Sequence, residues 1–191
     1  MPVFSMIRPS PFGEYAVLWS GGERGLLIHR IFLSDGKNTA SARTNNAFPG
    51  IIAGTEPIIE ELAGKIDDFF RGENVAFELE HLDWGRCSGF QERTLLVEKG
   101  VRRGDIITYS RIASRLGLPN GARAVGNALA GNPFPIIIPC HRAVRSDGSL
   151  GGFQGGLFMK RVLLEHEGIP FYRTGKVDFQ QVVKNLPQTD T

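Results

Sequence analysis

Two runs of mostly apolar residues, over residues 15–20 and 25–32, predict two neighbouring strands early in the chain, joined as a hairpin through residues 20–24. The first ten residues show no regular pattern and are predicted to be irregular. Residues 34–55 are rich in Ser, Asn, Thr and Gly, a composition typical of a long loop. The start of the chain is therefore predicted to be a hairpin between two irregular segments.

The next segment has the apolar spacing of a helix, which begins at Pro57 and ends at Gly72. Its apolar face consists of Ile58, Ile59, Leu62, Ile66, Phe69 and Phe70. Val75, Phe77 and Leu79 then alternate with polar residues and predict a further strand. The N-terminal part is thus predicted to be a small α/β unit with an ordinary core.

The second half of the chain predicts short helices separated by Gly-rich turns. The helical patterns cover residues 91–99, 108–117, 122–130 and 157–167. The second and third are joined by the turn 118–121, which makes them a helix-turn-helix candidate, although such pairs are common in proteins that bind no DNA. The apolar run 134–138 predicts a short buried strand.

A domain boundary is predicted near the turn-rich segment 83–89, where the charge balance changes sign. Residues 1–90 hold 8 Lys and Arg against 12 Asp and Glu, whereas residues 91–175 hold 12 against 6. The basic segment favours a polyanionic partner, although an Arg-rich solvated surface would carry the same charge. The predicted division is an N-terminal α/β domain over 1–88, a C-terminal domain over 89–175 and a peripheral tail over 176–191.

The remaining composition narrows the class of protein. No apolar stretch approaches the roughly 20 residues that a membrane span needs, and the N-terminus lacks the pattern of a secretory signal. Cys87 and Cys140 are far apart and the histidines are scattered, so no zinc cluster is expected. Two separate cysteines fit a reducing, intracellular compartment, which predicts a cytoplasmic protein, or a nuclear one in a eukaryote.

The candidate chemistry lies in the sequence Pro139-Cys140-His141-Arg142, directly after the apolar run. Cysteine chemistry needs a thiolate, and a thiolate needs a base or a positive charge nearby. His141 and Arg142 supply one of each. The alternative is a structural role, because free cysteines are among the most buried residues and Cys140 follows three isoleucines.

The predicted helix over 122–130 has an unusual surface, in which small residues surround one long side chain, Arg123. A smooth helix can approach a narrow groove, where a single long residue can enter the base stack. The alternative is tight packing of the small residues against a neighbouring helix. Residues 145–156 form a Gly-rich loop that permits close approach of a ligand to the backbone.

Glu167 lies at the end of the last predicted helix, where the helix dipole disfavours a carboxylate. It therefore either points to solvent or has a specific partner.

Together, these residues resemble the O6-alkylguanine-DNA alkyltransferase family over residues 90–168. The matching residues are Phe90-Gln91, Gly104, Thr108-Tyr109, Arg123-Ala124-Val125-Gly126, Gly131-Asn132-Pro133, Pro135 to Val144, Gly155-Gly156 and His166-Glu167-Gly168. The N-terminal residues match in layout only. The resemblance implies an α/β (α+β) fold, with a ribonuclease-H-like small sheet domain followed by a winged helix-turn-helix domain.

The resemblance implies DNA repair by direct, irreversible, single-turnover transfer of an alkyl (methyl) group from O6 of a flipped-out guanine to Cys140. It implies that His141, a water and Glu167 form the relay that deprotonates Cys140. Tyr109 would contact the flipped base and phosphate and protonate the leaving guanine. The partner would be the minor groove of double-stranded DNA containing O6-alkylguanine, and the protein would be a monomer without cofactor or metal.

On the same resemblance, Arg123 would take the place that the flipped base leaves, on the helix surface made of Ala122, Ala124 and Gly126. The residues assigned to active-site support and the alkyl pocket are Asn132, Pro135, Ala143, Phe153, Gln154 and Gly155. Two of them depart from the family pattern. Phe153 lacks the hydroxyl of a frequent Tyr, and Gln154 is larger than the residue in some members, which predicts a narrower pocket.

Two other functions compete with this interpretation. A sensor that binds alkylated DNA without transfer would not need Cys140, which this chain has. A cysteine hydrolase usually brings Cys and His together from distant positions and turns over repeatedly, unlike this adjacent pair.

Overall fold

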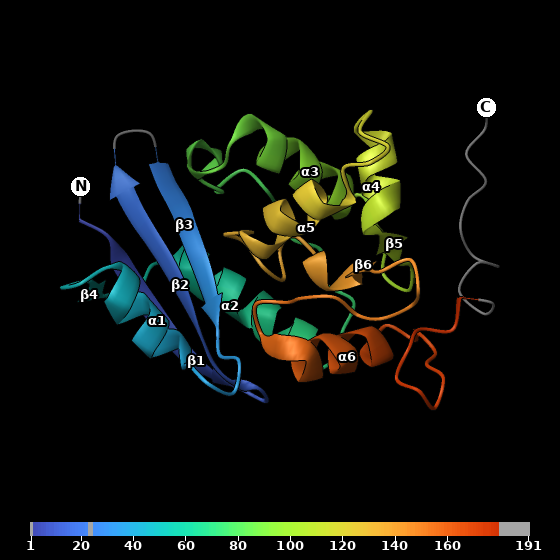
Figure 1. The fold of residues 1–191 in the computed structure, drawn as a ribbon. Coiled ribbons are helices and arrows are strands. Elements are labelled where there is room, and N and C mark those ends of the chain that lie inside the picture. The colour runs from blue at the N-terminus through green and yellow to red at the C-terminus, as the bar shows by residue number, and fades with distance from the viewer. Residues whose placement is uncertain (1, 23–24, 180–191) are drawn as a thin grey trace.

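A computed structural model of the protein describes residues 2–22 and 25–179. Its N-terminal part is a four-stranded sheet in the order β3-β2-β1-β4 (Figure 1). The strands are β1 (Phe4–Ser10), β2 (Gly13–Gly22), β3 (Gly25–Leu33) and β4 (Ile52–Ala53). The antiparallel pair β2 and β3 confirms the predicted hairpin. In its connection, Glu23 and Arg24 lie outside the described residues, as do residues 180–191 of the predicted tail.

The prediction that the first ten residues are irregular is wrong, because they contain β1. This strand pairs antiparallel with β2 from Phe4 opposite Trp19 to Ser10 opposite Gly13. Only Ser5 and Met6 of β1 are buried. The strand therefore depends on backbone pairing with β2, and its sequence shows no apolar alternation.

The long loop predicted over residues 34–55 is also wrong, since it contains α1 (Ala40–Ala47) and the short strand β4. Thr39 caps α1 by accepting a hydrogen bond from the Ala42 amide. The helix buries only Ala40 and Thr44, so it has no apolar stripe from which it could be predicted.

The helix predicted from Pro57 is confirmed as α2 (Pro57–Phe70), which packs on the sheet. The Tyr15 hydroxyl of β2 lies 3.0 Å from the Ala63 carbonyl oxygen of α2. The strand predicted over 75–79 is wrong. Its central residue, Phe77, is buried, but its carbonyl oxygen accepts a hydrogen bond from Lys99 Nζ (2.9 Å) rather than from a neighbouring strand.

The C-terminal part confirms the predicted helices. They are α3 (Gly89–Lys99), α4 (Tyr109–Arg115), α5 (Ala122–Ala130) and α6 (Gly156–His166). The short strands β5 (Ile107–Thr108) and β6 (Ala143–Val144) pair in parallel, and the 3₁₀ turns are η1 (Trp84–Arg86) and η2 (Cys140–Arg142). Figure 1 shows α3 to α6 grouped beside the sheet.

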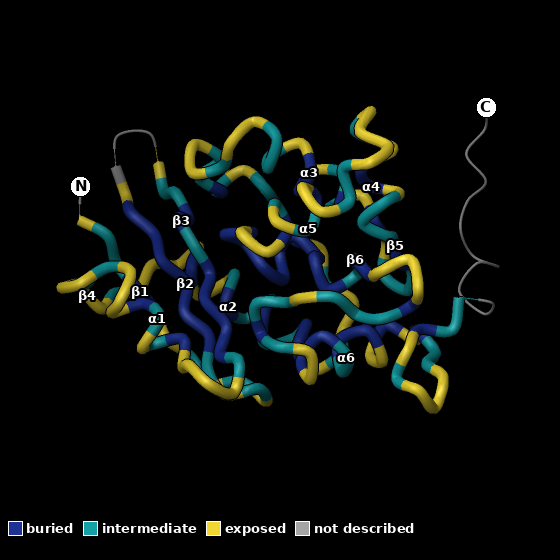
Figure 2. Tube along the Cα trace, viewed as in Figure 1, coloured by how far each residue is buried: buried dark blue, intermediate teal, exposed yellow. Residues whose placement is uncertain are grey.

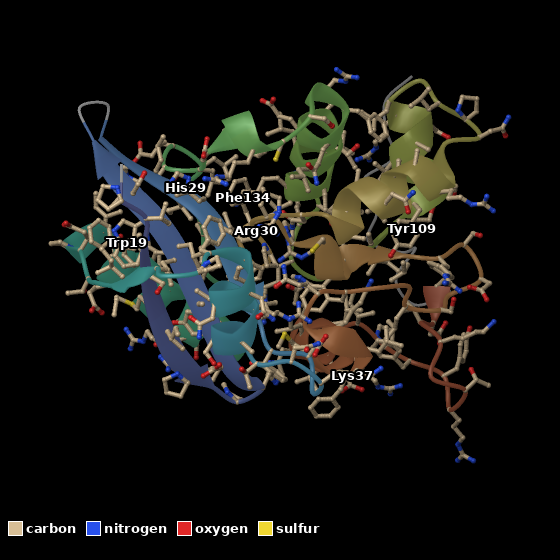
Figure 3. The ribbon with its side chains drawn as sticks, turned by 60° about the vertical axis from the view of Figure 1, so that its left-hand side comes forward. Trp19, His29, Arg30, Lys37, Tyr109 and Phe134 are labelled. Carbon is tan, nitrogen blue, oxygen red and sulfur yellow. The ribbon has the colours of Figure 1, made fainter. Side chains whose placement is uncertain are left out.

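The strand predicted over 134–138 is wrong, because these residues form a turn. Ile138 donates its amide hydrogen to the Phe134 carbonyl oxygen (2.9 Å), and Ile136 has a positive φ of 75°. A buried apolar run does not distinguish a strand from a packed turn by periodicity. The turn lies against the sheet, since the Ile31 amide donates to the Pro133 carbonyl oxygen (2.8 Å), and Figure 3 shows Phe134 next to the strand that carries His29 and Arg30.

The main apolar core runs through both halves of the chain. It extends from β2, β3 and α2 into α3, α4, α5 and the turn 134–138, and Figure 2 shows the buried trace of β2 and β3. The core is continuous across the predicted boundary at 83–89, and the predicted domain division stays a prediction. Within the described residues, no helix has both the length and the apolar character needed to cross a membrane.

Candidate active site

A cleft of about 560 Å³ opens between α5 and the loop that follows β6. Six of the predicted site residues line it, namely Tyr109, Ala122, Arg123, Gly126, Cys140 and Phe153. The cleft therefore brings together the candidate nucleophile, the Arg-bearing helix and the Gly-rich loop, which are well separated in the sequence.

Cys140 is a neutral thiol at the inner end of this cleft. It begins η2, and only 6% of its surface is exposed. Asn132 Nδ2 lies 3.3 Å from Cys140 Sγ, while Asn132 Oδ1 accepts the Phe134 amide hydrogen (2.8 Å). Burial raises the pKa of Cys140 to about 11, although the hydrogen bond from Asn132 opposes this shift. The thiol therefore needs a base at the moment of reaction.

His141 follows Cys140 in η2, is fully buried and does not line the cleft. Its Nε2 is 3.0 Å from Glu167 Oε1, and Arg142 binds the same carboxylate through Nε (2.9 Å) and Nη2 (2.8 Å). Glu167 therefore has specific partners rather than pointing to solvent. Arg142 Nη1 also donates to the Val101 carbonyl oxygen (2.5 Å), which fixes the guanidinium.

The charges in this group favour a neutral imidazole beside an ionised carboxylate. Burial lowers the pKa of His141. Burial alone would raise the pKa of Glu167, but the hydrogen bonds from His141 and Arg142 outweigh it and lower this pKa to about 2. Nε2–H then donates to Glu167, and Nδ1, which has no hydrogen-bond partner among the described residues, carries the lone pair.

The 3₁₀ turn explains how adjacent residues serve one site. In an extended chain the side chains of Cys140 and His141 would point to opposite faces, whereas a 3₁₀ turn separates them by about 120°. The imidazole is held by edge contacts with Phe69 and Phe153, with ring centroids 5.6 and 6.2 Å away. Phe153 therefore supports the base as well as lining the cleft.

The small residues of α5 leave an open wall. Val125 and Leu129 anchor the helix in the core, while a Cβ added at Gly126 would have no atom within 4 Å. Tight helix packing therefore does not account for Gly126. Arg123 is exposed at the first turn. Ala124 is also exposed but lies outside the lining of the cleft.

Tyr109 closes the cleft opposite α5, at the start of α4. Burial raises the pKa of Tyr109 to about 12, with further contributions from Cys140 and Glu98, so its phenol stays protonated at neutral pH. Gly151 lies directly over this phenol, because a Cβ on Gly151 would overlap the hydroxyl oxygen and lie 2.9 Å from Cε2 of the ring.

Known proteins match the part of the chain that builds this cleft. The family model of the 6-O-methylguanine DNA methyltransferase DNA-binding domain matches residues 89–169, a range that contains every predicted site residue. A human methylated-DNA–protein-cysteine methyltransferase is 37% identical over 173 residues, which cover 87% of this chain and 80% of the human protein. The chain belongs to the methylated-DNA–protein-cysteine methyltransferase family.

Two other relatives agree with this assignment. The family member from Methanothermobacter thermautotrophicus is 46% identical over 111 residues, which cover 58% of this chain and 62% of the relative. The crystal structure of Mycobacterium tuberculosis OGT in complex with DNA superposes with a TM-score of 0.69 at 28% identity, covering 86% of this chain and 92% of that one. The fold expected from the resemblance is therefore confirmed.

The remaining predicted residues of this family member lie around the cleft rather than in its lining. Pro135 and Ala143 are buried, and Ala143 directly follows the turn η2 that contains Cys140. The Gln154 side chain binds β3, where its Oε1 accepts the Leu33 amide hydrogen (2.7 Å). Gln154 does not line the cleft. The sequence predicts a narrower pocket because of this larger side chain, but the side chain points to β3 instead. Gly155 packs against Met159 so closely that a Cβ at this position would overlap the Met159 sulfur.

The sequence analysis missed two buried charged residues, Glu98 and Lys160. Lys160 Nζ donates to the carbonyl oxygens of Ala143 (2.6 Å) and Gly152 (3.2 Å), which ties the loop to β6. Both charged residues interrupt the apolar face of a helix, Glu98 three residues after Leu95 and Lys160 beside Met159. A charged residue on the apolar face of a predicted helix was the sequence feature from which the two buried charges could have been predicted.

Proposed function

We propose that the protein repairs DNA by single-turnover transfer of an alkyl group from O6 of guanine to Cys140 Sγ. The observation that carries the proposal is the position of this sulfur, in a cleft whose wall bears Arg123, on the residue that precedes the buried imidazole–carboxylate pair in the turn η2. The family membership of the chain supports the same reaction.

The reaction begins with removal of the thiol proton, because the neutral thiol is a poor nucleophile. His141 Nδ1 is the acceptor, and the relay implied by the family resemblance carries the proton to it through a water. Glu167 stabilises the imidazolium that forms, and Arg142 holds Glu167 in place.

The thiolate then attacks the alkyl carbon, and the bond between that carbon and O6 breaks as the new C–S bond forms. The guanine leaves with the electron pair and takes a proton from the Tyr109 phenol. The resulting phenolate then receives the proton that His141 took from the thiol. The product is a thioether, which has no leaving group that water displaces readily. Each protein molecule therefore acts once.

The target base must leave the duplex, since Cys140 is only 6% exposed and lies inside the cleft. Flipping costs on the order of a few kcal/mol, and less for a damaged pair. Arg123 fills the gap in the stack, and the small residues of α5 allow the helix to enter the minor groove.

Transfer of labelled methyl from a duplex containing O6-methylguanine tests the proposal. The wild-type protein should accept one label per molecule, whereas Cys140→Ala should accept none while binding the same duplex. Binding without transfer by the wild type would favour a sensor, and repeated turnover on an ester or peptide would favour a cysteine hydrolase.

The proposal extends to the setting in which the protein works. Cys87 and Cys140 are both free thiols, and a reactive thiol requires a reducing compartment, which supports the cytoplasm, or the nucleus in a eukaryote. The proposed reaction uses one active site, so a monomer without metal or cofactor suffices.

A further inference from the structure

A second arginine lines the cleft on the wall opposite α5. Arg145 follows β6 directly, and its side chain is exposed. It forms no ion pair or side-chain hydrogen bond with any other described residue. The two walls of the cleft thus each present one guanidinium, Arg123 from α5 and Arg145 from the loop.

The backbone that carries Arg145 is firmly held. Its amide donates to the Ser149 carbonyl oxygen (2.9 Å), and its own carbonyl oxygen accepts from the Gly148 amide (3.0 Å). The Val177 amide in turn donates to the Gly148 carbonyl oxygen (2.9 Å). The preceding strand β6 pairs with β5. The side chain of Arg145 therefore begins from a fixed point at the cleft.

The acidic residue of this loop, Asp147, also lines the cleft, but its carboxylate already has partners of its own. Its carboxylate binds Lys176 Nζ (3.0 Å) and accepts hydrogen bonds from the Ser149 amide (3.0 Å) and hydroxyl (2.7 Å). Asp147 is the only acidic residue within residues 145–156. Its pairing with Lys176 leaves the positive charge of Arg145 available to an anion in the cleft.

The proposed reaction places an anion next to this position. When a nucleotide turns into the cleft, its base reaches Cys140 at the inner end while its phosphates stay at the mouth. We infer, on the basis of the proposed function, that Arg145 binds a phosphate flanking the flipped nucleotide and so positions the damaged base. A guanidinium suits this role because it offers parallel N–H donors to two phosphate oxygens.

Arg145→Gln tests the inference, with Arg71→Gln as the matched control. Arg71 is an exposed arginine at the end of α2 and does not line the cleft. Arg145→Gln should weaken binding to a methylated duplex about tenfold and reduce the slope of log affinity against log salt by about 1. Transfer from the free base O6-methylguanine, which has no phosphate, should keep its wild-type rate.

Neutral methylphosphonate links in the duplex locate the contact. A link at one phosphate beside the methylated guanine should weaken wild-type binding about tenfold but cause no further loss in Arg145→Gln, because the variant has already lost that contact. Links a helical turn away should weaken both proteins equally.

Three results would overturn the inference. The first is an Arg145→Gln variant whose duplex affinity and salt slope equal those of Arg71→Gln. The second is a loss of affinity from the methylphosphonate link that adds to the loss from Arg145→Gln at every flanking phosphate. The third is a slower transfer from the free base by Arg145→Gln, which would indicate a structural role. A wild-type protein that binds the duplex but transfers nothing would instead overturn the proposed function, while the affinity and methylphosphonate results would still decide on Arg145.

Discussion

Glu98 provides the sharpest physical prediction, because it is a fully buried carboxyl group without a hydrogen-bond partner among the described residues. Burial raises its pKa from 4.5 to about 8, although Lys160 and Arg142 oppose the shift. The perturbation is Glu98→Gln, which keeps the shape of the side chain and removes its titration. Burying the amide of Glu98→Gln in place of the carboxyl group changes the unfolding free energy by an amount that does not depend on pH. This amount therefore cancels when the variant is compared with wild type at different pH values.

The sign follows from the direction of the shift. The folded protein holds the Glu98 proton more tightly than the unfolded chain, so the stabilising contribution is fully present below pH 4.5 and is lost as pH rises through 8. The loss is about 1.4 kcal/mol for each pH unit between the two pKa values and less near each of them, which gives roughly 3–4 kcal/mol between pH 5 and pH 8. Relative to wild type, Glu98→Gln should gain that amount over the same range.

The assay is denaturant unfolding at pH 5, 6, 7 and 8, followed by the fluorescence of Trp19 and Trp84. Glu73→Gln, which removes an exposed carboxylate, is the control for loss of one negative charge. A difference in unfolding free energy between Glu98→Gln and wild type that stays constant from pH 5 to pH 8 would refute the reasoning, because it would mean that Glu98 ionises normally in the folded protein.

Three further substitutions test the walls of the cleft. Gly151→Ala places a Cβ against the Tyr109 hydroxyl at a φ of 67°, so transfer from methylated DNA should slow about 100-fold, and a rate near wild type would contradict the packing. Asn132→Ala removes a donor to Cys140 Sγ, which should raise the pKa of the thiol, measured as the pH dependence of iodoacetamide labelling; an unchanged profile would count against this contact. Gln154→Ala should lower the unfolding free energy by about 1–2 kcal/mol because a β3 amide loses its acceptor, yet leave transfer of methyl and benzyl groups unchanged; faster benzyl transfer would mean that Gln154 does narrow the pocket.

Local patterns were sufficient where one element buries one regular face. The helix α2 has such a face, and the sequence predicts it. The hairpin β2–β3 was predictable for another reason, because its long apolar runs are interrupted by a polar, Gly-rich turn. Elements held by pairing or capping were missed, because β1 takes its stability from its register with β2 and α1 from the Thr39 cap. The turn at 134–138 was mistaken for a strand because its residues are buried on all sides.

The candidate site was predictable in its composition but not in its arrangement. The sequence places Cys140 and His141 side by side, while only the 3₁₀ turn separates their roles, one at the cleft and the other behind it. The long-range contacts from Glu167 and from Lys160 join α6 to η2 and β6, and no local spacing predicts which partners such side chains find.

The most direct measurement of the central claim is the intact mass of the protein after incubation with a duplex containing O6-methylguanine. The proposed transfer predicts a stoichiometric gain of one methylene unit, about 14 Da, located on Cys140 by peptide mapping, and no gain in Cys140→Ala. An unchanged mass while the guanine loses its methyl group, or a gain on any other residue, would contradict the assignment of Cys140 as the acceptor.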